Sequence, residues 1–199
     1  KSKSSSTARV TGTSGKAKSV NVEVRKKMVF DKPNPNKIAE ELASREAATK
    51  DAEEKARLAK EKAQAVLTRI NPDSVDWLLA ADTTVAIGEH ILEKPCDYHD
   101  AYRMLVLLSG KTHAVHTAYA LIYLPTGQWH IACVTTEITF HNLSEQQIQE
   151  YINTGDPFDK AGGYGIQTVF NSFVKKIKGS YYNVMGLPIE DILKIINRT

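Results

Sequence analysis

The sequence predicts an α/β fold in which strands and helices alternate along one chain. Two pairs of strand-like segments are each joined by a short turn, which is the pattern of a β-hairpin. Segments with helical periodicity lie before, between and after these hairpins. With 199 residues, of which 42% are hydrophobic, the chain is long enough to bury a sizeable core.

The front of the chain differs in composition from the rest. Residues 1–19 are mostly Ser, Thr, Lys and Gly, so we expect a disordered arm or a loop there and a single domain over residues 20–199. A loop of this composition could also cradle phosphates when a ligand is present. The alternation over Val20–Val24 predicts a strand, which Met28–Phe30 extends. A turn over Pro33–Asn36 follows, with Asn36 as a helix N-cap.

Helical sequence extends from Lys37 to Ile70. One rod of that length would measure roughly 50 Å, which is long for a single domain, so we expect a break between Ala43 and Ala52. The second helix then begins at about Asp51 and ends before Pro72. Its inward side is predicted to carry Ala52, Ala56, Ala59, Ala63, Val66 and Ile70.

An apolar run, Leu78 to Ala81, ends abruptly in Asp82, which Thr83 follows. Buried strands of α/β folds are nearly continuous apolar runs, and ligands of open α/β sheets bind beyond the carboxyl ends of strands. We therefore expect Asp82 at a sheet edge that faces a cleft. A carboxylate there suits metal binding or general-base catalysis. The structural alternative is a turn or capping residue.

The remaining elements follow from turn and capping signals. Hairpins are predicted around Gly88-Glu89 and around Pro125–Gln128. Further predictions are a helix from Asp97 to Ser109, a helix with a Ser144–Gln147 capping box that ends near Asn153, a glycine-rich loop over Asp156–Gln167, a strand over Phe173–Ile177 and a final helix that begins at Pro188.

Composition narrows the classes of function. The net charge of +3 does not by itself imply nucleic acid, although basic residues crowd the front and no acid precedes Glu23. Binding of nucleic acid through this arm is one hypothesis, but no RNA-binding aromatic motif accompanies it. No apolar run reaches 18 residues, so no membrane span is expected. Cys96 and Cys133 form no CxxC pair and suit a reducing cytosol, which predicts a cytoplasmic protein.

Four lysines stand in distinctive contexts: Lys62, Lys94, Lys111 and Lys160. Each alone is explained by a solvated surface charge, yet lysine is also a compact cation well suited to phosphate. Glycines at 162, 163 and 165 would let backbone N–H groups approach a ligand closely. No Walker P-loop pattern is present in the sequence.

Five motifs in order carry a resemblance to a known family. They are Ala80-Ala81-Asp82-Thr83-Thr84, Glu93-Lys94-Pro95, Leu108-Ser109-Gly110-Lys111-Thr112-His113, Asp159 through Gln167, and Asn183-Val184-Met185-Gly186-Leu187-Pro188. The series resembles the Maf family of nucleoside triphosphate pyrophosphatases, related in fold to inosine triphosphate pyrophosphatases. The glycine-rich motif resembles the branch that hydrolyses dTTP and UTP.

The resemblance implies a central mixed β-sheet flanked by helices, with two lobes around a cleft. It implies an enzyme that uses Mg²⁺ or Mn²⁺ to convert a nucleoside triphosphate substrate to the monophosphate and pyrophosphate, and it implies a homodimer. Asp82 would be the catalytic base and a metal ligand. Substrate would be bound by Arg9, Lys62, Thr83, Lys94, Lys160 and Gln167.

The front departs from the family pattern. The family opens with a Ser-x-Ser-Pro-Arg-Arg loop, whereas this chain has Ser4-Ser5-Ser6-Thr7-Ala8-Arg9. Where the family has an Asp-Glu pair, this chain has Asp31-Lys32, and a gained base would weaken metal binding there. The alternative hypothesis is therefore a Maf-like nucleotide-binding protein with weakened catalysis.

Overall fold

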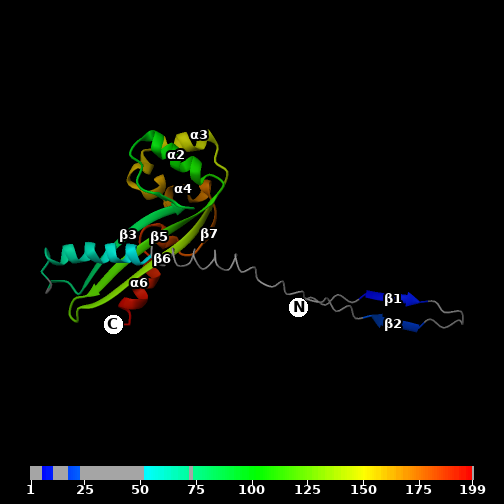
Figure 1. The fold of residues 1–199 in the computed structure, drawn as a ribbon, viewed down its shortest axis with the longest axis horizontal. Helices are drawn as coiled ribbons and strands as arrows, with labels where there is room; N and C mark the ends of the chain where they lie inside the picture. Colours follow the sequence, from blue (N-terminus) through cyan, green and yellow to red (C-terminus); the bar gives the residue numbers. More distant parts are fainter. Residues whose placement is uncertain (1–5, 11–17, 23–51, 72–73, 199) are drawn as a thin grey trace. The chain divides into compact units, whose positions relative to one another are not determined.

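The computed structural model describes residues 6–10, 18–22, 52–71 and 74–198 (Figure 1). These residues belong to two units, one within Lys1–Ala43 and one within Ser44–Thr199. Several predicted features lie outside the described residues: Asp31-Lys32, the turn at 33–36 and the first helix from Lys37.

The first unit contains a two-stranded hairpin. Strand β1 (Ser6–Val10) pairs antiparallel with β2 (Lys18–Val22), in the register Ala8↔Val20. The expectation of a loop over this part of the front is therefore wrong for residues 6–10. The β-branched residues Thr7, Val10, Val20 and Val22 favour strand conformation.

The second unit is built on one antiparallel sheet, which confirms the α/β class. Its strands lie in the order β4-β3-β5-β6-β7, and every described pair in it is antiparallel, so parallel pairing of a mixed sheet is not seen in this part of the chain. The strands are β3 (Trp77–Ile87), β4 (His90–Leu92), β5 (Thr112–Tyr123), β6 (Gln128–Phe140) and β7 (Val174–Lys178). Both predicted hairpins, β3–β4 and β5–β6, are present.

Strand β3 does not end at Asp82. Its ladder with β5 continues from Trp77↔Tyr123 to Ala86↔Ala114, and β4 pairs with its other edge over Val85–Ile87. The prediction that the strand ends at Asp82 is wrong because the rule behind it applies to parallel sheets, whereas an antiparallel strand can carry a polar residue mid-length where its face is open. Asp82 lies in the part of the strand that β4 leaves uncovered.

Helices cover both faces of the long strands. The helix over residues 52–67 places Ala59 and Ala63 against Ala118 and Ala120 of β5. On the opposite face, α6 (Ile189–Ile196) packs Ile192 against Tyr119 and Leu121. Val66, predicted to point inward, is 40% exposed because the contact with the sheet ends at Ala63. None of the described helices is both long and apolar enough to cross a membrane.

A second group of helices, α2 (Tyr98–Leu108), α3 (Glu145–Asn153) and α4 (Ile166–Phe173), gathers at the end of the sheet where β3 finishes (Figure 1). Helix α2 begins at the predicted cap Asp97, and α3 has the predicted Ser144–Gln147 capping box. The predicted glycine-rich loop contains two 3₁₀ turns, η2 (Asp156–Asp159) and η3 (Ala161–Gly163). Two short helices, α4 and α5 (Tyr181–Val184), were not predicted.

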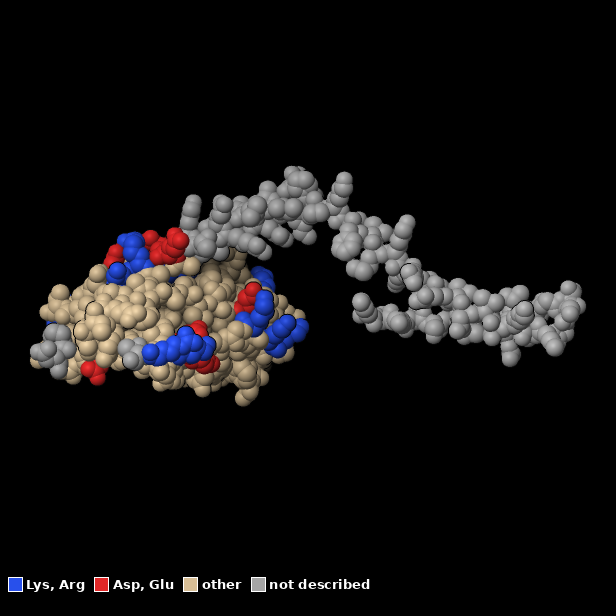
Figure 2. Space-filling view, turned by 90° about the horizontal axis from the view of Figure 1, so that it is seen from below, with Lys and Arg blue, Asp and Glu red and all other residues tan. Residues whose placement is uncertain are grey.

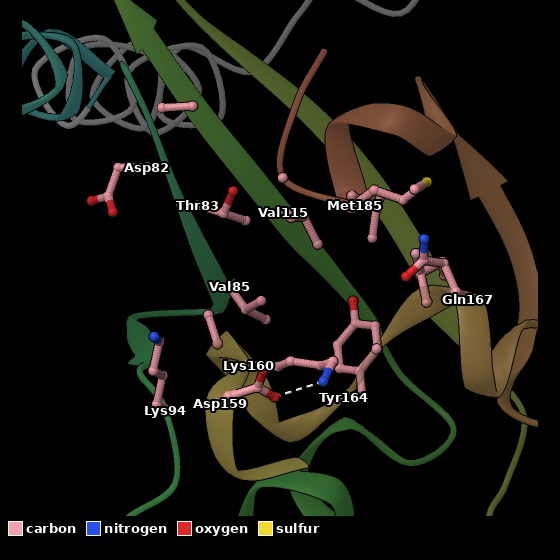
Figure 3. Close-up of a pocket in the computed structure, with 16 residues that line it drawn as sticks. Asp82, Thr83, Val85, Lys94, Val115, Asp159, Lys160, Tyr164, Gln167 and Met185 are labelled. Atoms are coloured by element: carbon pink, nitrogen blue, oxygen red, sulfur yellow. Dashed lines mark hydrogen bonds and ion pairs between the residues drawn. The ribbon is translucent and has the colours of Figure 1, made fainter. Parts of the chain in front are cut away.

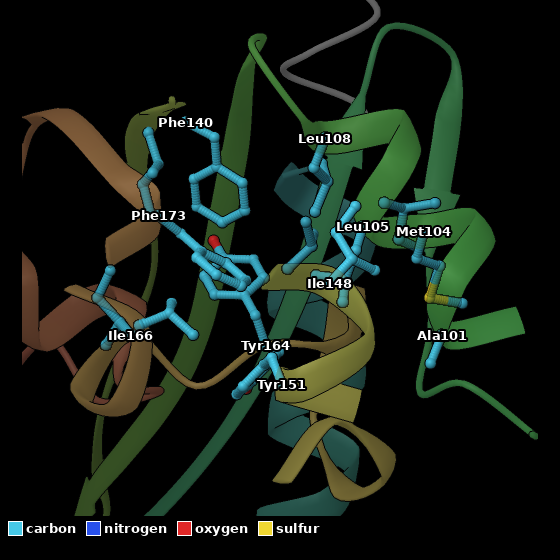
Figure 4. Close-up of a cluster of buried hydrophobic side chains, with 14 of the residues drawn as sticks. Ala101, Met104, Leu105, Leu108, Phe140, Ile148, Tyr151, Tyr164, Ile166 and Phe173 are labelled. Atoms are coloured by element: carbon cyan, nitrogen blue, oxygen red, sulfur yellow. The ribbon is translucent and has the colours of Figure 1, made fainter. Parts of the chain in front are cut away.

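The main core lies between this helical layer and the sheet (Figure 4). Phe140 makes edge-to-face contacts with His113, Tyr164 and Phe173, at centroid distances of 4.9, 4.9 and 5.9 Å. Such contacts add specific geometry to the burial of aromatic surface. They fix Tyr164, and with it the glycine-rich segment, against the sheet.

Candidate active site

One pocket lies where the sheet meets the glycine-rich segment (Figure 3). Its volume is about 310 Å³, which is within the range of small-molecule sites. Asp82 and Lys94 lie at one end in Figure 3, and Gln167 and Met185 lie at the other. The pocket therefore has a charged end and an end of neutral polar and apolar side chains.

Asp82 and Thr83 are consecutive residues of β3 and point to opposite faces of the sheet. Lys62, from the helix over residues 52–67, donates a 2.6 Å hydrogen bond to Oδ1 of Asp82. Both side chains are about half exposed, at 54% and 42%, so neither is sealed in the core. Oδ2 of Asp82 accepts no hydrogen bond from another residue of the described chain, which leaves one carboxylate oxygen open to the pocket.

Two more lysines line the pocket. Lys94 follows β4 and forms no ion pair with any described residue. Lys160, between the two 3₁₀ turns, pairs with Asp159 at 2.6 Å, and its pKa is raised chiefly by the hydrogen bond to Asp159. Together with Lys62, three ammonium groups from three separate segments lie at or beside one pocket.

Hydrogen bonding fixes the orientation of the Thr83 hydroxyl. Thr117, fully buried on β5, donates its only hydroxyl hydrogen to the carbonyl oxygen of Asn183 at 2.8 Å. The 2.9 Å contact between Thr83 and Thr117 must then have Thr83 as the donor. Thr83 therefore offers only oxygen lone pairs to the pocket and acts there as an acceptor.

Asn183 stabilises this arrangement through further hydrogen bonds. Its Nδ2 group donates to the carbonyl oxygen of Val115 and to Oγ1 of Thr136, both at 3.1 Å. A carbonyl can only accept, so the amide orientation is fixed. Because Asn183 is fully buried, it positions α5 and the neighbouring Met185 at the rim of the pocket.

Tyr164 forms part of the pocket wall and is 5% exposed. Its hydroxyl is 2.7 Å from Nε2 of His113, and burial raises the pKa of the tyrosine. Burial also lowers the pKa of His113 to about 4, so the imidazole is neutral at neutral pH. The pair is uncharged and closes the wall between pocket and core.

The glycines of the motif do not present N–H groups to the pocket as expected. The amide of Gly162 donates to the carbonyl of Glu93, that of Gly163 to the carbonyl of Lys160, and that of Gly165 to the hydroxyl of Tyr151. The expectation was wrong because these glycines serve tight turns. Gly162 has φ +73°, and a Cβ there would lie 2.9 Å from Val85.

The charged end has the donor chemistry for a phosphate-bound divalent ion. No group of three or more His, Cys, Asp or Glu side chains suited to a metal occurs in the described part of the chain. Mg²⁺ in nucleotide enzymes is commonly held by one or two carboxylates together with substrate phosphates and water. Asp82, with an open oxygen beside the lysines, fits that requirement.

The structure places most predicted site residues around this pocket. Asp82, Thr83, Lys94, Lys160 and Gln167 line it, and Lys62 reaches it through Asp82. Arg9 lies on β1 in the other unit and Lys111 is not among the lining residues. Lining residues that were not predicted to have a role include Val115, Tyr164, Ile166 and Met185. Tyr164, Ile166 and Met185 belong to the family motifs at 159–167 and 183–188, so those motifs could have indicated them.

The rest of the described surface mixes charges of both signs. On the face shown in Figure 2, most basic side chains stand beside acidic ones. Elsewhere on the described chain, ion pairs such as Arg57–Glu61, Arg103–Asp100 and Lys178–Glu137 likewise combine opposite charges. The face in Figure 2 offers no broad basic surface for nucleic acid among its described residues.

Comparisons with known proteins agree with the motifs. The family model described as Maf-like protein matches residues 6–199. A dTTP/UTP pyrophosphatase of Chlorobium phaeovibrioides is 49% identical over 138 residues, which cover 68% of this chain and 70% of that protein. The dTTP/UTP pyrophosphatases of Thermococcus kodakarensis and Clostridium perfringens are 46% and 45% identical, over 77% and 70% of this chain and 80% and 71% of their own. With a family match across nearly its whole length and relatives this similar around the residues of the pocket, the chain belongs to the Maf family.

Proposed function

We propose that this protein hydrolyses dTTP and UTP to the nucleoside monophosphate and pyrophosphate. The observation that carries the proposal is one pocket with an acidic side chain and lysines at one end and neutral hydrogen-bonding groups at the other. A triphosphate tail suits the first end and a pyrimidine base suits the second. The relatives from Chlorobium phaeovibrioides and Thermococcus kodakarensis, both named dTTP/UTP pyrophosphatases, support this substrate class.

The lysines would bind the phosphates. Lys62, Lys94 and Lys160 approach from three segments, so they can contact different phosphoryl groups of one tail. As the bond between the α- and β-phosphates breaks, negative charge moves onto the leaving pyrophosphate. Fixed cations at that place stabilise the transition state more than the ground state.

Asp82 would act as the general base. Its open Oδ2 accepts a proton from a water molecule, whose oxygen attacks the α-phosphorus as the bond to the β-phosphate oxygen breaks. The water oxygen ends on the monophosphate, and pyrophosphate leaves with the electron pair of the broken bond. Lys62, bonded to Oδ1, keeps the carboxylate oriented through this step.

We further propose that Mg²⁺ or Mn²⁺ is required, with Asp82 as its protein ligand. When bound, the ion supplies charge neutralisation to the triphosphate and polarises its oxygens. Among the described residues the charged end holds Asp82 and Asp159 against three lysines, so the lysines alone do not balance a triphosphate.

The pocket would select a nucleobase whose N3–H group can donate a hydrogen bond to Thr83. Thr83, which lies between Asp82 and Val115 in Figure 3, is an acceptor, and the Gln167 amide offers both a donor and an acceptor. Uracil and thymine present an N3–H donor between two carbonyl acceptors, so they can satisfy both residues. Cytosine lacks the N3–H group and matches this set less well.

A substrate panel tests the proposal. Nucleoside triphosphates and modified forms are assayed for pyrophosphate with Mg²⁺ and with Mn²⁺, beside the Asp82→Asn variant. The proposal expects pyrophosphate release that is fastest with dTTP and UTP and that is lost in the variant. Failure to release pyrophosphate from any substrate with either ion overturns it. Binding without turnover would instead favour the weakened nucleotide-binding protein.

Two further points remain proposals. Cys96 and Cys133 form no CxxC pair, and this cysteine usage supports a reducing, cytoplasmic location. A homodimer rests on the family resemblance alone, and light scattering of the purified protein measures it directly.

A further inference from the structure

Two aspartates share the ammonium group of Lys160. Its Nζ atom donates to the backbone oxygen of Asp156 at 2.9 Å and pairs with Oδ1 of the same residue at 3.1 Å. It also donates to Oδ1 of Asp159 at 2.6 Å. An ammonium carries three hydrogens, and the two hydrogen bonds occupy two of them, one on each aspartate. A phosphate oxygen that approaches Lys160 from the pocket competes with Asp159, the aspartate that lines the pocket.

Asp156 is braced by buried groups. Its Oδ2 atom accepts a 2.5 Å hydrogen bond from the hydroxyl of Tyr151, a residue that is 7% exposed. The same hydroxyl accepts a 2.9 Å hydrogen bond from the amide of Gly165. Burial alone would raise the pKa of Asp156, but hydrogen bonds from Tyr151 and Lys160 outweigh it, so the pKa is lowered. Asp156 is therefore a fixed anion.

Gly165 leaves room for the aliphatic part of the Lys160 side chain to lie beside Asp156. A Cβ at residue 165 would come within 2.8 Å of Cε of Lys160 and 3.0 Å of Oδ2 of Asp156. The lysine side chain therefore rests on the backbone of the glycine-rich segment. Its direction is set by packing as well as by hydrogen bonds.

Asp159 is held differently. Its side chain is 77% exposed, and it lines the pocket at the end of η2. An exposed carboxylate that pairs with one lysine gains little, because water competes for both partners. Of the two aspartates on Lys160, Asp159 is the one that an incoming anion can displace at low cost.

We infer that Asp156 is a positioning residue that aims Lys160 at the substrate, and that Asp159 holds one ammonium hydrogen until a phosphate oxygen replaces it. The inference rests on the proposed function, because it requires a phosphate-bearing substrate in the pocket. It assigns opposite roles to two acids bonded to one lysine. A general electrostatic effect would give them the same role, since loss of either negative charge would favour a polyanion.

The test compares Asp156→Asn and Asp159→Asn, with Tyr151→Phe as a second probe of the brace. Glu93→Gln is the matched control, because it removes an exposed carboxylate next to Lys94 without touching Lys160. For each variant, KM and kcat are measured with dTTP, and Kd is measured with α,β-methylene-dTTP by calorimetry. Thermal melting identifies any variant that does not fold.

Opposite shifts are expected. Asp159→Asn should lower KM and Kd about threefold, as for release of an exposed ion pair. Asp156→Asn should raise both about tenfold, as for loss of a charged hydrogen bond, and Tyr151→Phe should raise them in the same direction by less. Glu93→Gln should change them less than about twofold. If Asp156→Asn does not fold, Tyr151→Phe carries this part of the test.

Shifts in the same direction for the two aspartates overturn the inference, as does a Glu93→Gln effect equal to that of Asp159→Asn. The proposed function fails separately, if the parent protein releases no pyrophosphate. In that event the Kd values for α,β-methylene-dTTP still decide the inference, because they require binding and not turnover.

Discussion

Replacement of Asp82 by Asn should separate catalysis from folding. The carboxylate is 42% exposed and its partner Lys62 is 54% exposed. An ion pair this exposed contributes about 0–1 kcal/mol to stability, and Asn keeps the size of the side chain. A general base contributes about 10²- to 10⁴-fold to rate, which is about 3–5 kcal/mol of the activation barrier. The expected effect on activity is therefore several times the effect on stability.

The assay pairs urea unfolding with pyrophosphate release from dTTP at saturating substrate. Glu137→Gln is the control, because it makes the same chemical change in another exposed pair, Lys178–Glu137, whose side chains are 72% and 49% exposed. Both variants should unfold within about 1 kcal/mol of the parent. Only Asp82→Asn should lose activity. An Asp82→Asn protein as active as the parent would refute the assignment of the base.

Three more predictions concern the stability of the fold that carries the site. Burial lowers the pKa of His113 to about 4 from its ordinary value of 6.5. Between these two pH values the imidazole is protonated in the unfolded chain and neutral in the folded protein. Stability should therefore fall by about 3 kcal/mol between pH 6.5 and 4, and chemical denaturation of His113→Asn should lack this slope. Gly162→Ala should lose at least about 1 kcal/mol in urea unfolding, since φ is +73° and the new Cβ would meet Val85; an unchanged midpoint would contradict this. Ser144→Ala should lose about 1 kcal/mol by removal of the α3 capping box, and Ser144→Asp should restore most of it.

Local signals in the sequence were enough to predict several elements. The Asp97 cap, the Ser144–Gln147 capping box and the two hairpin turns each depend on residues close in sequence, and all four are present. Helix α4 was missed because its preceding residues, glycines and a tyrosine, give no capping signal. Its N-cap residue, Gly165, has no side chain that could cap the helix. Packing of Ile166 and Val169 in the core therefore stabilises the helical conformation of this segment.

Part of the site was predicted from sequence motifs, and not from the local turn and capping signals that predicted the elements. Asp82 and Lys94 were singled out by motifs, but the rule that placed Asp82 at a strand end belongs to parallel sheets and did not apply. The support behind Lys160 could not be read from the sequence, because Tyr151 is an ordinary inward residue of an amphipathic helix. Likewise Thr117 gains its role only from contacts across the sheet and with Asn183.

Hydrolysis of dTTP in ¹⁸O-labelled water tests the central claim most directly. Asp82 is proposed to direct water to the α-phosphorus, so mass spectrometry should find the label in the monophosphate and none in pyrophosphate. Label in pyrophosphate, or release of orthophosphate in its place, would contradict that claim.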